Sequence, residues 1–109
     1  MNSEKEIYEV DFTEDCRDEI RDIYKYISES LVAEEAAKRL MKKMRDNVME
    51  LAEFPRKYVK LPKNDKRKRE FRRMVINNYV ILYTIDEGRK KIYVSHMYYG
   101  KRNYTDNLI

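Results

Sequence analysis

Apolar positions at the start of the chain predict one strand followed by one helix. Residues 7–12 alternate between apolar and polar, which favours a half-buried strand with Tyr8, Val10 and Phe12 on one face. Thr13 is placed to cap a helix, whose apolar residues then recur at helical spacing over about 17 residues. The apolar stripe of this first helix is Ile20, Ile23, Tyr24, Ile27 and Leu31.

A second helix is predicted from about Val32 to Glu53. Ser28 and Ser30 interrupt the first stripe and are expected to cap this helix, and Pro55 stops it. Its apolar residues again recur at helical spacing, as expected of a helix packed on a core. They are Ala33, Ala37, Leu40, Met41, Met44, Val48 and Leu51.

Three further strands are predicted at 71–76, 79–85 and 92–99. Asn77-Asn78 suits the positive φ angles of a tight hairpin turn, and residues 86–88 turn the chain again. The strand at 79–85 is apolar on both faces, which is typical of a central strand. The order β-α-α-β-β-β predicts an α+β fold, with two helices packed on one face of a small, mainly antiparallel four-stranded sheet.

Length and composition fit one domain. The chain has 109 residues, 42% hydrophobic and 40% charged, so residues 1–109 are expected to form a single unit. A basic loop at 63–69 is expected to lack fixed structure, and residues 103–109 form a polar tail. No apolar run is long enough to span a membrane, and Met1 to Glu6 do not resemble a signal peptide. A cytoplasmic protein with no membrane partner is expected.

Charge is distributed unevenly. Residues 1–55 hold 9 Lys/Arg and 15 Asp/Glu, a net charge of 9 − 15 = −6. Residues 56–109 hold 15 and 5, a net charge of 15 − 5 = +10. Such a field attracts RNA, DNA or an acidic protein segment, although a lysine-rich loop also serves solubility. The arginines that continue into the strand at 71–76 favour a nucleic-acid or acidic-partner surface.

Most enzyme signatures are missing from the sequence. It contains no glycine-rich phosphate loop, no GxSxG and no HExxH, and its single histidine, His96, cannot form a histidine cluster. Neither a metal nor a cofactor is expected. The single cysteine, Cys16, is expected to be a half-buried helix residue rather than a catalytic thiol.

A basic and aromatic set remains on the last strands and the tail. It comprises Arg72, Arg73, His96, Tyr98, Tyr99, Lys101, Arg102 and Tyr104. Arginines neutralise phosphates and tyrosines stack on unpaired bases, so the set suits RNA binding or cleavage by the ribose 2′-hydroxyl. The same set of residues would also be explained if the tyrosines pack against the sheet and the arginines are solvated residues at its edge. Alternation sends Arg72 and Arg73 to opposite faces, without showing which of them faces away from the helices.

Several segments, in order and at matching spacing, resemble toxins of the RelE/ParE superfamily from bacterial type II toxin–antitoxin systems. The resemblance runs from about Ile7 to Leu108. The matching segments are Tyr8 to Glu14, Asp22 to Ile27, Ala36 to Leu40, Leu51 to Pro55, Phe71 to Tyr83, and Tyr98 to Tyr104.

The resemblance implies a toxin held inactive by a cognate antitoxin. The antitoxin would wrap an extended, partly helical segment around the toxin, with acidic residues to meet the basic half of the chain and apolar anchors for the helices or sheet. RelE-like members cut mRNA in the ribosomal A site, whereas ParE-like members block DNA gyrase and cut nothing. The favoured reading is ribosome-dependent mRNA cleavage, with gyrase inhibition as the alternative and an inactive paralogue as a third reading.

The resemblance also implies roles for individual residues. Arg73, with Arg72, would hold phosphate, Arg102 would stabilise the transition state, and His96 or Tyr104 would transfer protons. Further contacts to nucleic acid would come from Lys66, Arg67, Lys68, Arg69, Lys101 and Tyr99. Two departures weaken the match to the nucleases. Val80 stands where they often carry an arginine, and their C-terminal tyrosine has no direct counterpart near Leu108.

Overall fold

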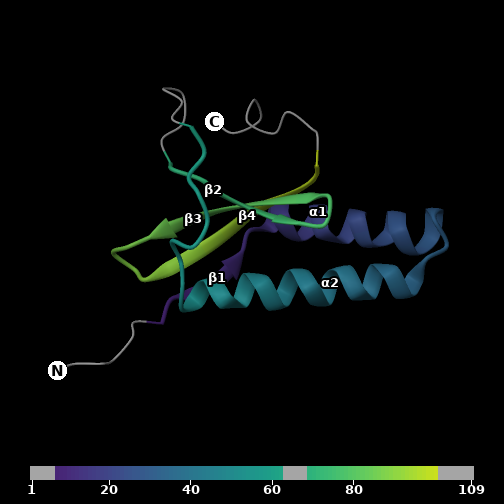
Figure 1. Cartoon of the computed structure of the whole chain (residues 1–109), viewed down its shortest axis with the longest axis horizontal. Coiled ribbons are helices and arrows are strands. Elements are labelled where there is room, and N and C mark those ends of the chain that lie inside the picture. Colours follow the sequence, from purple (N-terminus) through teal and green to yellow (C-terminus); the bar gives the residue numbers. More distant parts are fainter. Residues whose placement is uncertain (1–6, 63–68, 101–109) are drawn as a thin grey trace.

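The four strands form one mixed sheet in the order β1-β4-β3-β2. The computed structural model describes residues 7–62 and 69–100. β1 pairs with β4 in parallel, while β4–β3 and β3–β2 are antiparallel. The element order confirms the predicted β-α-α-β-β-β arrangement (Figure 1). The elements are β1 (Glu9–Phe12), α1 (Glu14–Lys25), a π-helical turn η1 (Tyr26–Ser30), α2 (Glu34–Met49), a 3-10 turn η2 (Glu50–Ala52), β2 (Arg72–Ile76), β3 (Tyr79–Asp86) and β4 (Lys91–Tyr99).

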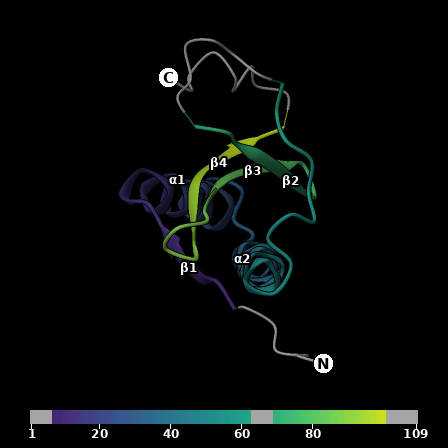
Figure 2. The same ribbon diagram turned by 90° about the vertical axis from the view of Figure 1, so that its left-hand side faces the viewer.

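Both helices cover the same face of the sheet, and the main core lies between them and the strands (Figure 2). β3 is central and almost entirely buried, as its apolar sequence predicts. Thr13 caps α1 as predicted, because its Oγ1 accepts a hydrogen bond from the Cys16 amide at 3.2 Å. The fully buried side chains of this core include Ala37, Val48, Leu51, Met74, Tyr83 and Ile92.

The connection between the helices differs from the prediction. Helix α1 continues through the π-helical turn to Ser30, so Ser28 bonds back to the Lys25 carbonyl instead of capping α2. Helix α2 begins at Glu34 after Ala33, which makes no side-chain capping bond. Leu31 is 55% exposed rather than part of the apolar stripe. The turn is closed by Val32, whose positive φ of 48° directs the chain into α2.

A β-bulge at Ser95 sets the faces of β4. Val94 pairs with Tyr83, but the next pair towards the end of β4 is His96 with Leu82, so Ser95 is the extra residue. Val94 and Met97 therefore both reach the main core. His96 lies on the opposite face, which it would not do in an uninterrupted alternation from Val94.

The chain before the basic block is ordered along the free edge of β2. Lys60 forms an antiparallel bridge with Arg72, the Leu61 amide donates to the Phe71 carbonyl, and the Arg73 amide donates to the Val59 carbonyl. These bonds satisfy backbone groups that an edge strand would otherwise leave open. Of the predicted flexible block at 63–69, only Arg69 falls within the described residues.

Gly100 directly follows β4 and lies against the β2–β3 turn. Its amide donates to the Asn78 carbonyl, and a Cβ added at Gly100 would lie 2.7 Å from that oxygen. Gly100→Ala should therefore force the backbones apart and lower the free energy of unfolding by about 1–3 kcal/mol in urea titrations. Gly88→Ala is the control, because its Cβ would meet only Asp86 Oδ1, at 3.7 Å. Equal stability of the two variants would contradict the close approach.

Cys16 is more buried than predicted. Its side chain is 0% exposed, and burial raises the pKa of the thiol from 9.0 to about 12. The thiol is thus protonated at neutral pH and closed to solvent, which agrees with the expectation of a structural rather than catalytic residue.

The raised pKa of Cys16 predicts a pH-dependent stability. The unfolded thiol ionises at its usual pKa of 9.0, whereas the folded thiol keeps its proton up to a pKa of about 12. This contribution to stability is complete below pH 9.0 and is lost as the pH rises towards 12. In urea titrations between about pH 8 and 11, the wild type should lose stability more steeply than Cys16→Ala, by up to about 1.4 kcal/mol per pH unit. Parallel pH profiles would contradict this linkage.

Candidate functional site

The face of the sheet opposite the helices carries the candidate site. Register places three residues of this face side by side across three strands. Arg73 of β2 pairs with Leu82 of β3, which pairs with His96 of β4. Two strand spacings separate the Arg73 and His96 Cα atoms, roughly 10 Å. A cationic and an imidazole side chain therefore flank an apolar residue in one row.

The structure shows which of the two arginines on β2 faces away from the helices, a question that the sequence left open. Met74 and Ile76 of β2 lie in the main core, so Arg72 shares the helix side of the strand and Arg73 the opposite face. Arg72 is half-buried, and its Nη1 donates to the Tyr58 carbonyl at 2.7 Å. Arg72 thereby holds the segment before β2, whereas Arg73 is exposed on the candidate surface.

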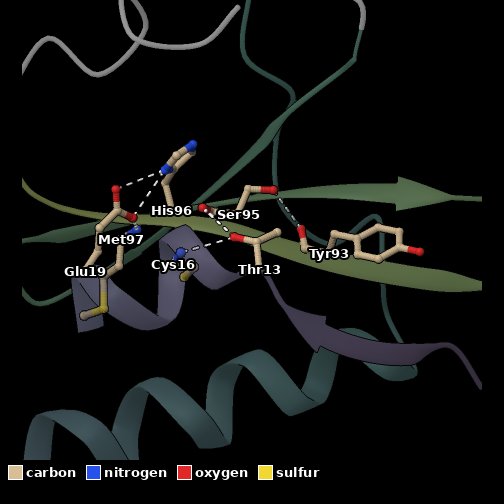
Figure 3. Close-up of polar contacts among 7 residues, drawn as sticks. All are labelled: Thr13, Cys16, Glu19, Tyr93, Ser95, His96 and Met97. Carbon is tan, nitrogen blue, oxygen red and sulfur yellow. Dashed lines mark hydrogen bonds and ion pairs between the residues drawn. The ribbon is translucent and has the colours of Figure 1, made fainter. Parts of the chain in front are cut away.

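His96 is oriented by a carboxylate from α1. Its Nδ1 lies 3.2 and 3.1 Å from the two Glu19 carboxylate oxygens, and Glu19 Oε1 also accepts the Met97 amide at 3.0 Å. Figure 3 shows this arrangement, with the second ring nitrogen of His96 pointing away from Glu19. The ring also stacks on Tyr98, with centroids 5.1 Å apart and an interplanar angle of 17°. Two contacts thus fix the imidazole, whose side chain is 19% exposed.

Apolar side chains form the floor beside this row. Leu61, Val80, Leu82 and Tyr98 make a second small core, with Phe71 packed against it. Val80, which replaces the arginine of many RelE-like nucleases in the resemblance above, is only 5% exposed. The centre of the face is consequently apolar, and its charged groups stand at the two sides.

A cavity of about 850 Å³ adjoins the row at the β3–β4 hairpin. Thr84 and Tyr93, which pair in register next to the row, line it. Its lining includes five cations, Arg56, Lys60, Arg69, Arg72 and Arg89, and three carboxylates, Glu70, Asp86 and Glu87.

Ion pairs within the cavity account for all three carboxylates. Arg56 pairs with Glu87, Lys60 with Glu70 at 3.4 Å, and Arg89 with Asp86 at 4.0 Å. In this part of the structure, Arg69 and Arg72 are the cations without a carboxylate partner. The cavity is therefore positively charged, as a phosphate-binding surface requires.

Other predicted site residues are not brought to this row. Tyr99 lies on the other face of β4, is 62% exposed, and contacts Tyr79 edge-on with ring centroids 5.5 Å apart. Arg69 is at the cavity rather than in the row. The remaining predicted residues lie outside the described ranges: Lys66, Arg67, Lys68, Lys101, Arg102 and Tyr104.

Neither a metal cluster nor a membrane span is present in the described part of the chain. Residues 7–62 and 69–100 contain no group of three or more His, Cys, Asp or Glu side chains placed to hold a metal ion. Across the same ranges, no helix combines the length and apolarity needed to cross a membrane.

A family model of the ParE toxin of the type II toxin–antitoxin system parDE matches residues 10–104. The chain belongs to the ParE toxin family. The match spans most of the sequence and includes every strand and helix of this toxin except the start of β1. The toxin matched no curated protein in a separate sequence comparison.

Solved structures share the toxin's fold. A chain of the chromosomal ParDE system of P. aeruginosa superposes with a TM-score of 0.70 at 12% identity, covering 89% of this toxin and 100% of that chain. A chain of the RelBE2 toxin–antitoxin complex of Mycobacterium tuberculosis gives 0.59 at 16%, covering 85% and 98%. The isolated RelE toxin of E. coli gives 0.55 at 17%, covering 92% of each. These similarities confirm the predicted RelE/ParE-like fold.

Glu19 is the site residue that the sequence did not indicate. It stands 77 positions before His96 and looks like one of several acidic residues on the solvent face of α1. No spacing rule joins the two. A single histidine on a strand beside an acidic helix was the only available signal, and it does not say which carboxylate reaches the ring.

Proposed function

We propose that this ParE-family toxin cleaves mRNA on the ribosome without a metal ion. The observation that carries the proposal is the row of Arg73 and His96 on the open face, with His96 held by Glu19. A fixed imidazole opposite a guanidinium is suited to transfer a proton beside a phosphodiester. Action on translating ribosomes implies a cytoplasmic location.

In the proposed reaction, the ribose 2′-hydroxyl attacks the adjacent phosphorus. His96 Nε2 accepts the hydroxyl proton while the new O–P bond forms. The bond to the 5′-oxygen breaks, and that oxygen takes a proton from an acid, for which the resemblance offers Tyr104. Arg73 and Arg102 balance the charge that accumulates on the phosphate oxygens. The products are a 2′,3′-cyclic phosphate and a free 5′-hydroxyl.

The positive cavity supports an RNA partner. It adjoins the open face at Thr84 and Tyr93, so a strand held at the row would extend towards Arg69. Contacts of this kind bind the backbone without reading the sequence. Within the ribosome they would supply affinity, together with the basic block at 66–69.

The second candidate is inhibition of DNA gyrase without cleavage, which the resemblance to ParE-like toxins implies. Buried Val80 favours it, because an apolar side chain occupies the place of a nuclease arginine at the centre of the face. A protein partner does not need a cation for a phosphate at that place, whereas a nuclease does.

A cognate antitoxin is the partner common to both candidates. The related structures from M. tuberculosis and Pyrococcus horikoshii are toxin–antitoxin complexes. The proposed antitoxin carries an acidic, partly extended or helical segment, which complements the net charge of 15 − 5 = +10 in residues 56–109.

Primer extension on a translated mRNA after brief toxin expression tests the proposal. New 5′ ends in frame with codons, absent when translation is blocked, are the expected result. The same cells are scored for gyrase-dependent DNA breaks. Intact mRNA with broken DNA would establish the second candidate, and unaffected growth would indicate an inactive paralogue.

Arg102→Ala should abolish growth arrest while leaving the fold unchanged. The resemblance places Arg102 where RelE-like nucleases carry the arginine that stabilises the transition state, and such a cation contributes about 100- to 1,000-fold to the rate. Growth curves and primer extension measure the loss, and circular dichroism verifies the fold. Undiminished arrest by the folded variant would remove Arg102 from the reaction.

A further inference from the structure

We propose that Glu19 is a positioning residue that sets the tautomer of His96 and leaves Nε2 free to accept a proton. The inference rests on the proposed function and assigns one further residue to it. The carboxylate of Glu19 bonds to the His96 ring and to the Met97 amide, and it would act only through the imidazole.

The geometry defines the direction of the hydrogen bond. Both carboxylate oxygens lie within 3.2 Å of Nδ1, and an ionised carboxylate can only accept. Nδ1 must therefore carry the proton. In the neutral ring Nε2 then holds a lone pair, and this nitrogen points away from Glu19 (Figure 3).

Glu19 is itself held in place by the backbone of β4. Its Oε1 accepts the Met97 amide at 3.0 Å, at the stretch of β4 that follows its pairing with β1. The Thr13 hydroxyl donates to the Ser95 carbonyl on the same edge. The carboxylate side chain is 27% exposed. At this edge of β4, Glu19 of α1 and its cap Thr13 thus satisfy backbone groups that a neighbouring strand would otherwise pair. The carboxylate is therefore fixed before any substrate binds.

This environment distinguishes Glu19 from other acidic residues of α1. Asp18, for example, pairs with Arg21 at 3.0 Å with its side chain 56% exposed, which is an ordinary surface ion pair. Asp22, one turn beyond Glu19, is exposed. Asp22→Asn is therefore a matched control that removes a carboxylate from α1 without approaching His96.

Glu19→Gln separates the structural from the positioning role. The glutamine oxygen can still accept the Met97 amide, while its NH₂ group donates to Nδ1 and requires a lone pair there. The proton then moves to Nε2, where it blocks proton acceptance. An amide at the equivalent place of a serine-protease triad lowers the rate about 10⁴-fold through the same change of tautomer.

Two measurements on the purified toxin test the inference. The chain has one histidine, so the ¹⁵N shifts of a labelled sample report the His96 tautomer without ambiguity. We expect Nδ1–H in the wild type and in Asp22→Asn, and Nε2–H in Glu19→Gln. Ribosome-dependent mRNA cleavage should fall about 100- to 10,000-fold in Glu19→Gln alone.

The readouts distinguish the two ways of failing. An unchanged tautomer in Glu19→Gln, or a changed tautomer with full cleavage, would overturn the positioning role. A wild-type toxin that leaves mRNA intact would overturn the proposed function. The catalytic role of Glu19 would then be overturned as well. The NMR experiment would still decide whether Glu19 sets the tautomer.

Discussion

His96→Gln should reduce mRNA cleavage about 100- to 10,000-fold, because it removes the group proposed to accept the 2′-hydroxyl proton. Glutamine remains polar and can keep a hydrogen bond at this half-buried strand position, so the fold should survive. Primer extension with purified ribosomes measures the effect on cleavage. Toxin-induced growth arrest should be lost in parallel.

Arg45→Gln is the matched control for His96→Gln. It introduces the same side chain at an exposed position of α2, on the other side of the molecule from the row. Antitoxin binding and circular dichroism should be unchanged in both variants. Full cleavage by a folded His96→Gln variant would exclude His96 from the chemistry and leave Arg73 with a binding role alone.

The regular elements could be predicted because their side-chain periods differ. A period of two identified β1, and a helical period identified the stripe that places Leu40, Met44 and Val48 in the core. Local chemistry supplied the Thr13 cap and the turn at Asn77-Asn78, where Asn77 has the predicted positive φ, at 54°, and Asn78 does not. These features depend on neighbours close in sequence, which a single chain displays.

Features that depend on one inserted residue could not be predicted. Counting alternation from Ile92 and Val94 directs His96 towards the helices, and only the bulge at Ser95 sends it to the open face. The sequence predicts that His96 and Tyr98 share a face of the sheet. It does not predict whether that face is covered by the helices. The π-helical turn after Lys25 likewise displaced Leu31 from the stripe that helical spacing assigned to it.

The sequence predicted which residue types form the candidate site better than it predicted how those residues are arranged. The sequence named Arg73 and His96 together, and the register aligns both with Leu82. It also named Tyr99, which lies on the opposite face of β4. Glu19 could not be found, since its contact with His96 depends on how α1 crosses the edge of β4.

Tyr83→Ala should cause the largest loss of stability, about 3–5 kcal/mol in urea titrations. Tyr83 lies on the central strand and is 0% exposed, and its hydroxyl donates to the Pro55 carbonyl at 2.8 Å. Truncation leaves a cavity and an unpaired carbonyl. Tyr83→Phe keeps the ring and should cost only about 1–3 kcal/mol, which measures the hydrogen bond.

That hydrogen bond also ties the sheet to the segment that supports the site. Pro55 begins the stretch in which Tyr58 holds Arg72 and Val59 to Leu61 line the edge of β2. Hydrogen exchange in Tyr83→Phe should therefore accelerate first at the amides of Leu61 and Arg73, while α2 stays protected. Tyr99→Phe, at an exposed ring, is the control. Equal acceleration of hydrogen exchange at all amides of Tyr83→Phe would contradict this prediction. It would show that the hydrogen bond stabilises the whole fold and not the edge segment in particular.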